Sequence, residues 1–358
     1  MTILKNRNTS LCQSNTYRFG AAFCISALLL VLLGGISTAA AQDNTPLQDQ
    51  FLETVKTEPI YLTGIFQTFG DLNLDNDYFS GGDSFHIGTA RLGLGGRLDR
   101  NVDWRVQFRL ESSPNLLDAF LTWHLDPLVS LRVGAQKPQV SAEQILSTGT
   151  TEFIRRARLS GTQLNSREIG VSLYGEGGMF GYNLGIFNGE GVRSNQDNRF
   201  QYLFRGYYHR DLDSGGSVEL GANVMTGSCY DLNCSPSSLN MAGNRTTTGV
   251  DFRLESGPWL LSAELLTTEA ELATPAIDSE RINGSHLTGG YTIDEGVRLL
   301  ARWDWMEYRE ADTETHLLTV GYDQYLSRLL RFQLNVMADL EQGESTALGA
   351  TGNIQFRF

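Results

Sequence analysis

Apolar and polar residues alternate with a period of two along most of this chain. Successive side chains of a β-strand point to opposite faces of the sheet, so this alternation predicts strands with one apolar and one polar face. From Ile60 onward the period recurs in segment after segment, and we expect an all-β protein. The clearest segment is 102–111, in which Val102, Trp104, Val106, Phe108 and Leu110 alternate with Asp103, Arg105, Gln107, Arg109 and Glu111.

Sixteen segments between residues 60 and 358 have the strand pattern, and their connections differ in length in a regular way. Short connections rich in turn residues alternate with mostly longer ones. An even number of strands joined in this way is typical of a transmembrane antiparallel β-barrel, with short periplasmic turns and long outer loops. The short connections are 99–101, 126–127, 177–178, 256–258, 294–296 and 326–328, and the long ones are 70–84, 137–167, 189–199, 227–245 and 269–284. The predicted strands are 60–69, 85–98, 102–111, 116–125, 128–136, 168–176, 180–188, 200–210, 216–226, 246–255, 259–268, 285–293, 297–307, 315–325, 330–340 and 348–358.

The first 41 residues have the three parts of a secretory signal peptide. A basic region without acidic residues is followed by an apolar stretch over about residues 21–36 and then by two small residues, Ala39 and Ala41. The apolar stretch is shorter than the ~20 residues of a membrane-spanning helix. We therefore expect residues 1–41 to be removed after about Ala41, leaving a short polar segment, 42–59, and a barrel domain, 60–358.

The secretion signal and the strand pattern together indicate the bacterial cell outer membrane. In lipid only helices and closed barrels satisfy every backbone polar group, and no later segment is apolar enough for a spanning helix. The last predicted strand carries Ile354, Phe356 and Phe358 on its apolar face. A terminal aromatic residue in this position is typical of outer-membrane barrels, and we expect the barrel-assembly machinery to recognise Phe358.

Charge and cysteine content narrow the function further. Loss of three basic residues with the signal peptide would change the formal net charge from −13 to −16, which argues against a nucleic-acid partner. Cys229 and Cys234 would be the remaining cysteines, and the oxidising periplasm favours a small loop disulfide between them. No catalytic, cofactor or metal-ligand motif stands out, so we expect no enzyme activity, no cofactor and no metal site.

Four pieces of the sequence resemble the phosphate-selective porin O and P family. They occur in the family's order, and the resemblance is most specific over about residues 100–210. It implies a sixteen-stranded barrel, a homotrimer, and a third outer loop, here 137–167, that folds inward to narrow the pore. The four pieces are Leu117–Phe120 with Leu131–Pro138, then Phe153–Arg156, Arg167–Val171 and Gly185–Gly191.

The resemblance and the strand pattern select the candidate site residues. Charges on a loop inside the lumen lie where water is confined and the field is focused, so a few of them can set ion preference. Arg155 and Arg156 have an alternative role, in which they pair with Glu168 and barrel-wall acids to hold the loop. The expected constriction and solute-contacting residues are Lys137, Arg155, Arg156, Arg158 and Arg132, and the expected lumen-lining residues are Arg91, Arg105, Arg109, Arg298 and Arg302.

One departure from the family concerns its phosphate specificity. Relatives use lysines at the constriction, whereas the chain after residue 41 keeps only Lys56 and Lys137 and has acids among its lumen arginines. We therefore predict an outer-membrane porin, a passive diffusion channel for small hydrophilic solutes or anions, with phosphate left open. A barrel with an adhesion or structural role and little conductance is the alternative. The expected partners are outer-membrane lipid and lipopolysaccharide, these solutes, the assembly machinery and two further copies of the chain.

Overall fold

A computed structural model describes residues 49, 51–53, 60–75, 78–111, 113–213, 215–230, 234–236, 239–274, 277–341 and 346–358. The predicted signal peptide, residues 1–41, and most of the polar segment 42–59 lie outside the described residues. Among the described residues, no helix has both the length and the apolar composition needed to cross a membrane.

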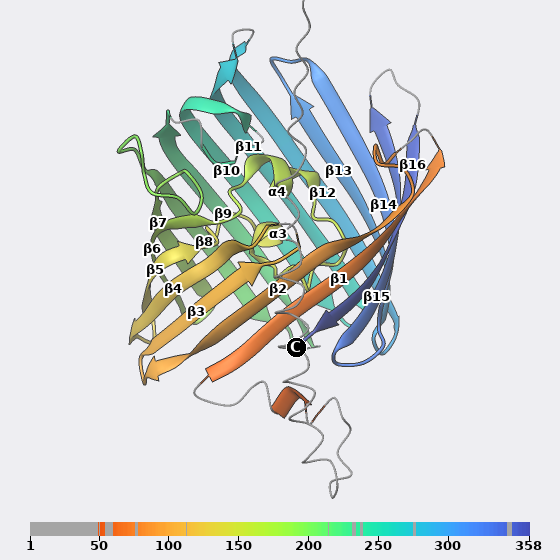
Figure 1. Ribbon diagram of the computed structural model, residues 1–358, viewed down its shortest axis with the longest axis horizontal. Coiled ribbons are helices and arrows are strands. Elements are labelled where there is room, and N and C mark those ends of the chain that lie inside the picture. The colour runs from red at the N-terminus through yellow and green to blue at the C-terminus, as the bar shows by residue number, and fades with distance from the viewer. Residues whose placement is uncertain are drawn as a thin grey trace, which may run out of the picture. The chain divides into compact units, whose positions relative to one another are not determined.

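The sixteen strands form one closed antiparallel barrel, so the predicted fold class is confirmed (Figure 1). Each strand pairs with its neighbours in sequence, and β1 pairs with β16 to close the sheet, for example Gln67 with Gln355. The strands are β1 (Ile60–Asp75), β2 (Ser84–Asp99), β3 (Val102–Arg109), β4 (Asn115–Asp126), β5 (Val129–Gln136), β6 (Glu168–Gly177), β7 (Phe180–Phe187), β8 (Gln201–Asp211), β9 (Gly216–Cys229), β10 (Met241–Ser256), β11 (Trp259–Thr274), β12 (Ile277–Asp294), β13 (Val297–Tyr308), β14 (Thr313–Tyr325), β15 (Leu330–Glu341) and β16 (Ala347–Arg357).

The alternation in the sequence becomes an alternation of burial in the barrel wall. In β13, Arg302 and Asp304 are buried while Leu299 and Trp303 are exposed on the other face. In β16, Ile354 is exposed on the outward face and Gln355 is buried. Since the sheet closes on itself, the polar set points into the lumen and the apolar set points outward, toward lipid.

The outer ends of several strands extend beyond their predicted limits. The segment 269–284, expected as a long loop, is mostly strand: Glu269 pairs with Arg281 and Glu271 with Ser279 in β11 and β12. Likewise β1 extends to Asp75, and the connection between β9 and β10 shortens because β9 reaches Cys229. The expectation of a long outer loop at 269–284 was therefore wrong. In these strand ends the outward residues, such as Glu269 and Arg281, are polar, while Ala270 and Ile282 are buried on the inner face, so the alternation is inverted relative to the lipid-facing part of the barrel.

The longest connection, 137–167, joins β5 to β6 and lies in the interior of the barrel. It includes two short helices, α3 (Ala142–Ile145) and α4 (Arg158–Gln163), of which α4 contacts β11, β12 and β13 (Figure 1). Its apolar residues pack on the inner wall, which fills the part of the lumen beside β7 to β13. The residues of this internal apolar cluster include Val140, Leu159 and Leu164 of the connection with Phe187, Leu203, Met225, Leu266, Ile282 and Met306 of the wall.

Phe358 lies at the seam where β1 and β16 close the barrel. Its backbone N–H donates to the carbonyl of Gly64, and its own carbonyl accepts from the Gly64 N–H, both at 3.1 Å. The ring of Phe358 covers Gly64, where any added Cβ would lie 2.3 Å from the ring, and it lies 5.5 Å from the ring of Phe356. The terminal aromatic pair therefore faces outward, away from the lumen.

Candidate functional site

Four buried arginines of the barrel wall bind the backbone of the segment 137–167. Arg205 on β8, Arg245 on β10, Arg302 on β13 and Arg331 on β15 are only 2–5% exposed. Each donates hydrogen bonds to main-chain carbonyls of the segment: those of Val140 for Arg205, Gln163 for Arg245, Arg155 for Arg302, and Gly149 and Thr151 for Arg331. The segment is thus held on strands from one half of the barrel.

Three of these arginines also have a carboxylate partner on the wall. Asp323 accepts two hydrogen bonds from Arg331, at 2.6 and 2.8 Å, and Asp304 accepts one from Arg302 at 2.7 Å. Arg205 is paired with Asp251 in the same way, at 2.9 Å. A buried charge is stable when it is paired and its remaining donors are bonded, and the loop carbonyls supply those bonds. These arginines therefore anchor the segment and leave little surface to a solute.

Acidic and basic residues of the segment itself also pair with the wall. Glu152 accepts from Arg253 on β10 at 2.7 Å, and its carbonyl accepts from Gln333 on β15 at 3.0 Å. One residue thus bridges strands that are far apart around the barrel, so the lumen is narrow at this level. Arg158 pairs with Asp339, and its backbone N–H donates to Asp304 at 3.1 Å.

A second group of arginines faces the part of the lumen beside β2 and β3. The side chains of Arg105 and Arg109 are 34% and 36% exposed, in contrast to the buried anchors. Arg91 on β2 is directly opposite Arg109 on β3, a like-charge pair that is unfavourable unless counter-charges are close. Among the described residues, the Nε atoms of all three make no hydrogen bond, although Asp118 and Glu111 lie 3.6 and 3.1 Å from those of Arg105 and Arg109.

Lys137, Arg156 and Arg167 of the segment bring further positive charge to the same place. The Nζ group of Lys137 donates hydrogen bonds to the carbonyls of Gln144 at 2.7 Å and Leu146 at 3.0 Å. Burial, with the nearby charges of Arg167, Arg156 and Arg91, lowers the pKa of Lys137 to about 6. Arg167 pairs with Asp118 at 2.7 Å. We call Arg91, Arg109, Lys137, Arg156 and Arg167 the cationic cluster.

The other predicted constriction residues have different surroundings. Arg155 is half exposed, with its guanidinium 3.4 Å from Asp71 and 5.4 Å from the Phe79 ring centroid. Arg132 lies between the rings of Phe120 and Tyr174 and donates to the Tyr174 hydroxyl at 2.9 Å. Of the expected lumen-lining residues, Arg298 is partly exposed, whereas Arg302 lies beneath the segment.

Glu168, considered as a partner for Arg155 and Arg156, binds other groups. Its carboxylate accepts from Asn165 at 2.8 Å and from the backbone N–H groups of Gly189 and Gly191, both at 3.0 Å. These bonds tie the connection after β7 to the interior segment. Beside them, Cys229 and Cys234 form a disulfide with a Cα–Cα distance of 5.7 Å. No group of three or more potential metal ligands occurs among the described residues.

Arg167 and Arg331 are site residues that lie outside the expected constriction and lumen-lining sets, for different reasons. Arg167 is the last residue before β6, where a loop residue has no assigned face, yet its pairing with Asp118 places it in the cationic cluster. Arg331 has lumen parity, but its contact with the segment depends on the path of that segment through the barrel. Strand parity places Arg331 on the lumen face without showing its contact with the segment, and nothing local in the sequence shows that Arg167 faces the lumen.

Comparisons with known proteins agree with this architecture. The anion-selective porin from Comamonas acidovorans is 16% identical, with a TM-score of 0.63 over 84% of this chain and 99% of that chain. The trimer form of in-vitro folded OmpT, an outer-membrane protein of Vibrio cholerae, is 14% identical, with a TM-score of 0.62 over 84% of this chain and 99% of that one. The outer-membrane channel DcaP of Acinetobacter baumannii is 11% identical, with a TM-score of 0.59 over 84% and 97% of the two chains. These likenesses show the fold.

No curated protein sequence matches this chain. The sequence profile of one family, described as phosphate-selective porin O and P, matches residues 62–354, which is nearly the whole barrel from β1 to β16. The family profile and the closed sixteen-stranded barrel agree with each other. The chain belongs to the phosphate-selective porin O and P family, and it is a porin of the outer membrane.

Proposed function

We propose that this porin conducts small anions through the part of the lumen that lies beside β2 and β3. Solutes would pass by diffusion between the inner wall and the segment 137–167, which narrows the pore. The cationic cluster would attract anions at the narrow point, because charge lining a confined water path sets ion preference. The wall arginines Arg105 and Arg132 extend the same positive face.

One observation supports this proposal more than any other. Arg91 and Arg109 lie directly opposite each other, and the side chain of Arg109 is 36% exposed, whereas the arginines on the other half of the barrel are buried as anchors. Partly exposed guanidinium groups at a narrow point of the lumen are suited to oxyanions, which guanidinium binds well. Asp118 and Glu111 reduce the positive charge there, so we expect an anion preference without a strong requirement for phosphate.

The proposal can be tested by recording from the purified porin in planar bilayers. In a potassium chloride gradient, the zero-current potential should indicate chloride preference, and Arg91→Gln with Arg109→Gln should shift it toward potassium. Arg298→Gln, which removes one charge outside the cationic cluster, is the control and should shift it less. An unchanged potential in the double variant would contradict the proposal, and a protein without step conductance would favour the adhesion or structural role.

We also propose how the chain is processed and assembled. Residues 1–41 would be removed as a signal peptide, and the assembly machinery would recognise the strand that ends at Phe358. The porin would be a homotrimer, a proposal supported by its likeness to the trimer form of OmpT from Vibrio cholerae. Exposed apolar residues at the outer ends of β1, β2 and β15, such as Leu72, Phe85 and Leu340, support a subunit contact on that side.

A further inference from the structure

Arginine and aromatic side chains alternate on the lumen face of four neighbouring strands, β3 to β6. Phe120 on β4 and Arg132 on β5 have the opposite parity to Leu121 and Val133, which are paired with each other and exposed on the outward face. Phe120 and Arg132 therefore point into the lumen, where both are partly exposed. We call Arg105, Phe120, Arg132 and Tyr174 the arginine–aromatic row.

Stacking contacts and hydrogen bonds to hydroxyl groups hold the arginine–aromatic row in place. Arg105 is directly opposite Phe120 on the neighbouring strand. The guanidinium carbon of Arg132 is 4.3 Å from the centroid of the Phe120 ring and 5.0 Å from that of the Tyr174 ring. Arg132 donates from Nε to the Thr122 hydroxyl at 3.0 Å and from Nη2 to the Tyr174 hydroxyl at 2.9 Å. Two uncharged oxygens thus fix the direction of this guanidinium without neutralising it.

The acids beside the row have basic partners of their own. The carboxylate of Asp118 lies 3.6 Å from Arg105 and 2.7 Å from Arg167. Asp103 is likewise paired with basic groups on β2 and β4, at 2.9 Å each. Within the part of the chain that the structure describes, Arg132 forms no ion pair with a carboxylate. The positive charge of Arg132 is therefore left for a solute anion.

The wall next to the Phe120 ring carries no side chain. Gly134 on β5 is directly opposite Phe120 and has a φ of +127°, a conformation that favours glycine. A Cβ at Gly134 would lie 2.2 Å from the backbone oxygen of Ala119 and 2.9 Å from the Cα of Phe120. The backbone itself thus excludes a side chain of β5 from this flank of the ring, and a flat solute can lie there.

The arginine–aromatic row lies on the periplasmic side of the cationic cluster. On β3, Arg105 is four residues nearer to the turn between β2 and β3 than Arg109 is. That separation is about 13 Å along the strand, at ~3.3 Å per residue. On β5, Arg132 lies close to the start of the strand, whereas Lys137 follows its end. An anion that enters from outside and passes the cationic cluster meets the row next.

We propose that the arginine–aromatic row binds small aromatic carboxylates on their way through the pore. The carboxylate would accept hydrogen bonds from Arg132, with additional attraction from Arg105, because guanidinium and carboxylate form strong charge-assisted hydrogen bonds. The ring of the solute would contact Phe120 and Tyr174 in the offset or edge-to-face geometry that aromatic pairs prefer. This inference rests on the proposed anion channel and specifies one class of its solutes.

Inorganic phosphate fits the row less well than an aromatic carboxylate does. The surface of phosphate consists of hydrated oxygen atoms. Placing these atoms against Phe120 and Tyr174 would remove their water without replacing its hydrogen bonds, which is unfavourable. A solute with one anionic end and one flat apolar end satisfies both the guanidinium and the rings. The row therefore favours aromatic carboxylates over phosphate.

Block of the chloride current in planar bilayers tests the proposal on the wild-type porin. Benzoate and cyclohexanecarboxylate have the same charge and nearly the same size, but only benzoate is flat and aromatic. Benzoate should reduce the open-channel current at a several-fold lower concentration than either cyclohexanecarboxylate or phosphate. Equal block by the two carboxylates overturns the proposal, as does a stronger block by phosphate.

Three variants locate the block within the lumen. Phe120→Leu removes the ring but keeps an apolar side chain, so it should weaken the benzoate block several-fold. Arg132→Gln should weaken the block by both carboxylates. Tyr207→Leu removes a partly exposed lumen ring on β8, outside the row, and as the matched control it should be blocked by benzoate as the wild type is. A step conductance in each variant shows that the barrel is intact, and a wild-type benzoate block in Phe120→Leu overturns the proposal.

The zero-current potential in a potassium chloride gradient separates this inference from the proposed function. A chloride preference without selective block by benzoate leaves the anion channel in place and overturns the row as a site for aromatic carboxylates. A potassium preference of the wild type overturns the proposed function, and the inference with it. A chloride preference together with a benzoate block that depends on Phe120 and Arg132 supports both.

Discussion

The guanidinium of Arg331 is enclosed by Asp323 and the carbonyls of Gly149 and Thr151, whereas that of Arg109 faces the lumen. The two residues have the same parity on their strands and the same charge. Burial separates their roles. The N–H groups of an enclosed guanidinium are hydrogen-bonded to the protein, whereas those of an exposed guanidinium can donate to a solute. Residue type and parity alone do not distinguish an anchor from a selectivity residue.

Lys137 should make ion selectivity depend on pH. Lys137 belongs to the segment that lines the narrow point of the lumen. Its pKa of about 6 means that the side chain is neutral well above pH 6 and positively charged well below it. Protonation adds a cation to the cationic cluster. Lowering the pH through 6 should therefore increase the preference for chloride over potassium, measured as the zero-current potential in a salt gradient.

Two substitutions isolate the contribution of Lys137 from that of other charged groups. Lys137→Met should remove the change around pH 6 and leave the weaker selectivity of the high-pH state. Lys137→Arg keeps the charge over the whole range, so it should show the stronger selectivity at every pH. A wild-type potential that stays constant through pH 6 would show that Lys137 does not titrate there.

At the scale of elements, Arg331 and Asp323 are expected to fix the position of the segment 137–167. Replacing both, as Arg331→Met with Asp323→Leu, removes a buried pair without leaving a lone charge, and it deletes the bonds to Gly149 and Thr151. Two lost hydrogen bonds weaken the anchor by about 1 kcal/mol each. The barrel should still fold, and single-channel recordings should show larger or noisier open currents.

The control for the anchor variant is Arg298→Met. Within the part of the chain that the structure describes, Arg298 makes no hydrogen bond to residues 137–167, so the segment should stay in place. The double variant at Arg331 and Asp323 could instead show the same open-channel noise as the wild type. That result would mean that the remaining anchors, Arg205, Arg245 and Arg302, are sufficient to hold the segment in place.

The strands and the interior segment differ in how far the sequence predicts them. All sixteen strands follow from period two, because lipid on one side and water on the other enforce the alternation. The pattern inverts above the lipid, where Glu269 and Arg281 face water on the outside and Ala270 and Ile282 are buried on the inside. The path of 137–167 depends on contacts with residues distant in sequence, such as Arg302 with the carbonyl of Arg155, which no local pattern encodes.

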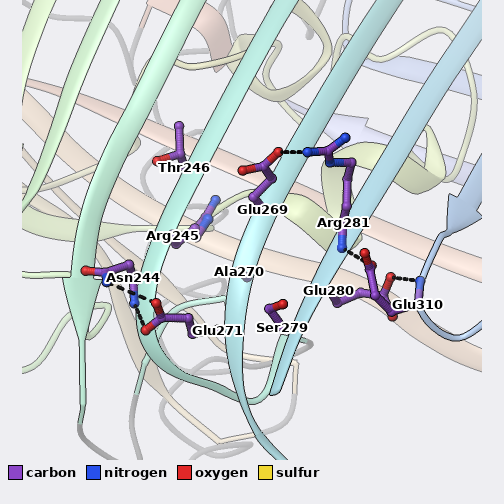
Figure 2. A pocket seen from close by; sticks show the side chains of 10 residues that line it. All are labelled: Asn244, Arg245, Thr246, Glu269, Ala270, Glu271, Ser279, Glu280, Arg281 and Glu310. Carbon is purple, nitrogen blue, oxygen red and sulfur yellow. Dashed lines mark hydrogen bonds and ion pairs between the residues drawn. The ribbon is translucent and has the colours of Figure 1, made fainter. Parts of the chain in front are cut away.

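At the scale of the whole molecule, the outer rim of the barrel is different on its two sides. On β10 to β12 the outward residues of the rim are polar, Asn244, Glu269 and Arg281 among them (Figure 2). On β1, β2 and β15 the outward residues stay apolar to the strand ends, and Phe85 is 90% exposed beside Gly70. An apolar rim above the hydrocarbon layer would contact water in a lone barrel, which favours its burial between subunits.

Phe85→Asp should therefore weaken the proposed trimer. A charge in the centre of an apolar subunit contact is left without water or a partner, and this desolvation cost opposes association. The variant should yield more monomer than the wild type in native mass spectrometry of the detergent-solubilised porin. Ser279→Asp adds the same charge at the exposed rim of β12 and should leave the oligomer unchanged. If both variants stay trimeric, the subunit contact lies elsewhere on the wall. If both dissociate, assembly is sensitive to any added charge at the rim, and the apolar contact does not explain it.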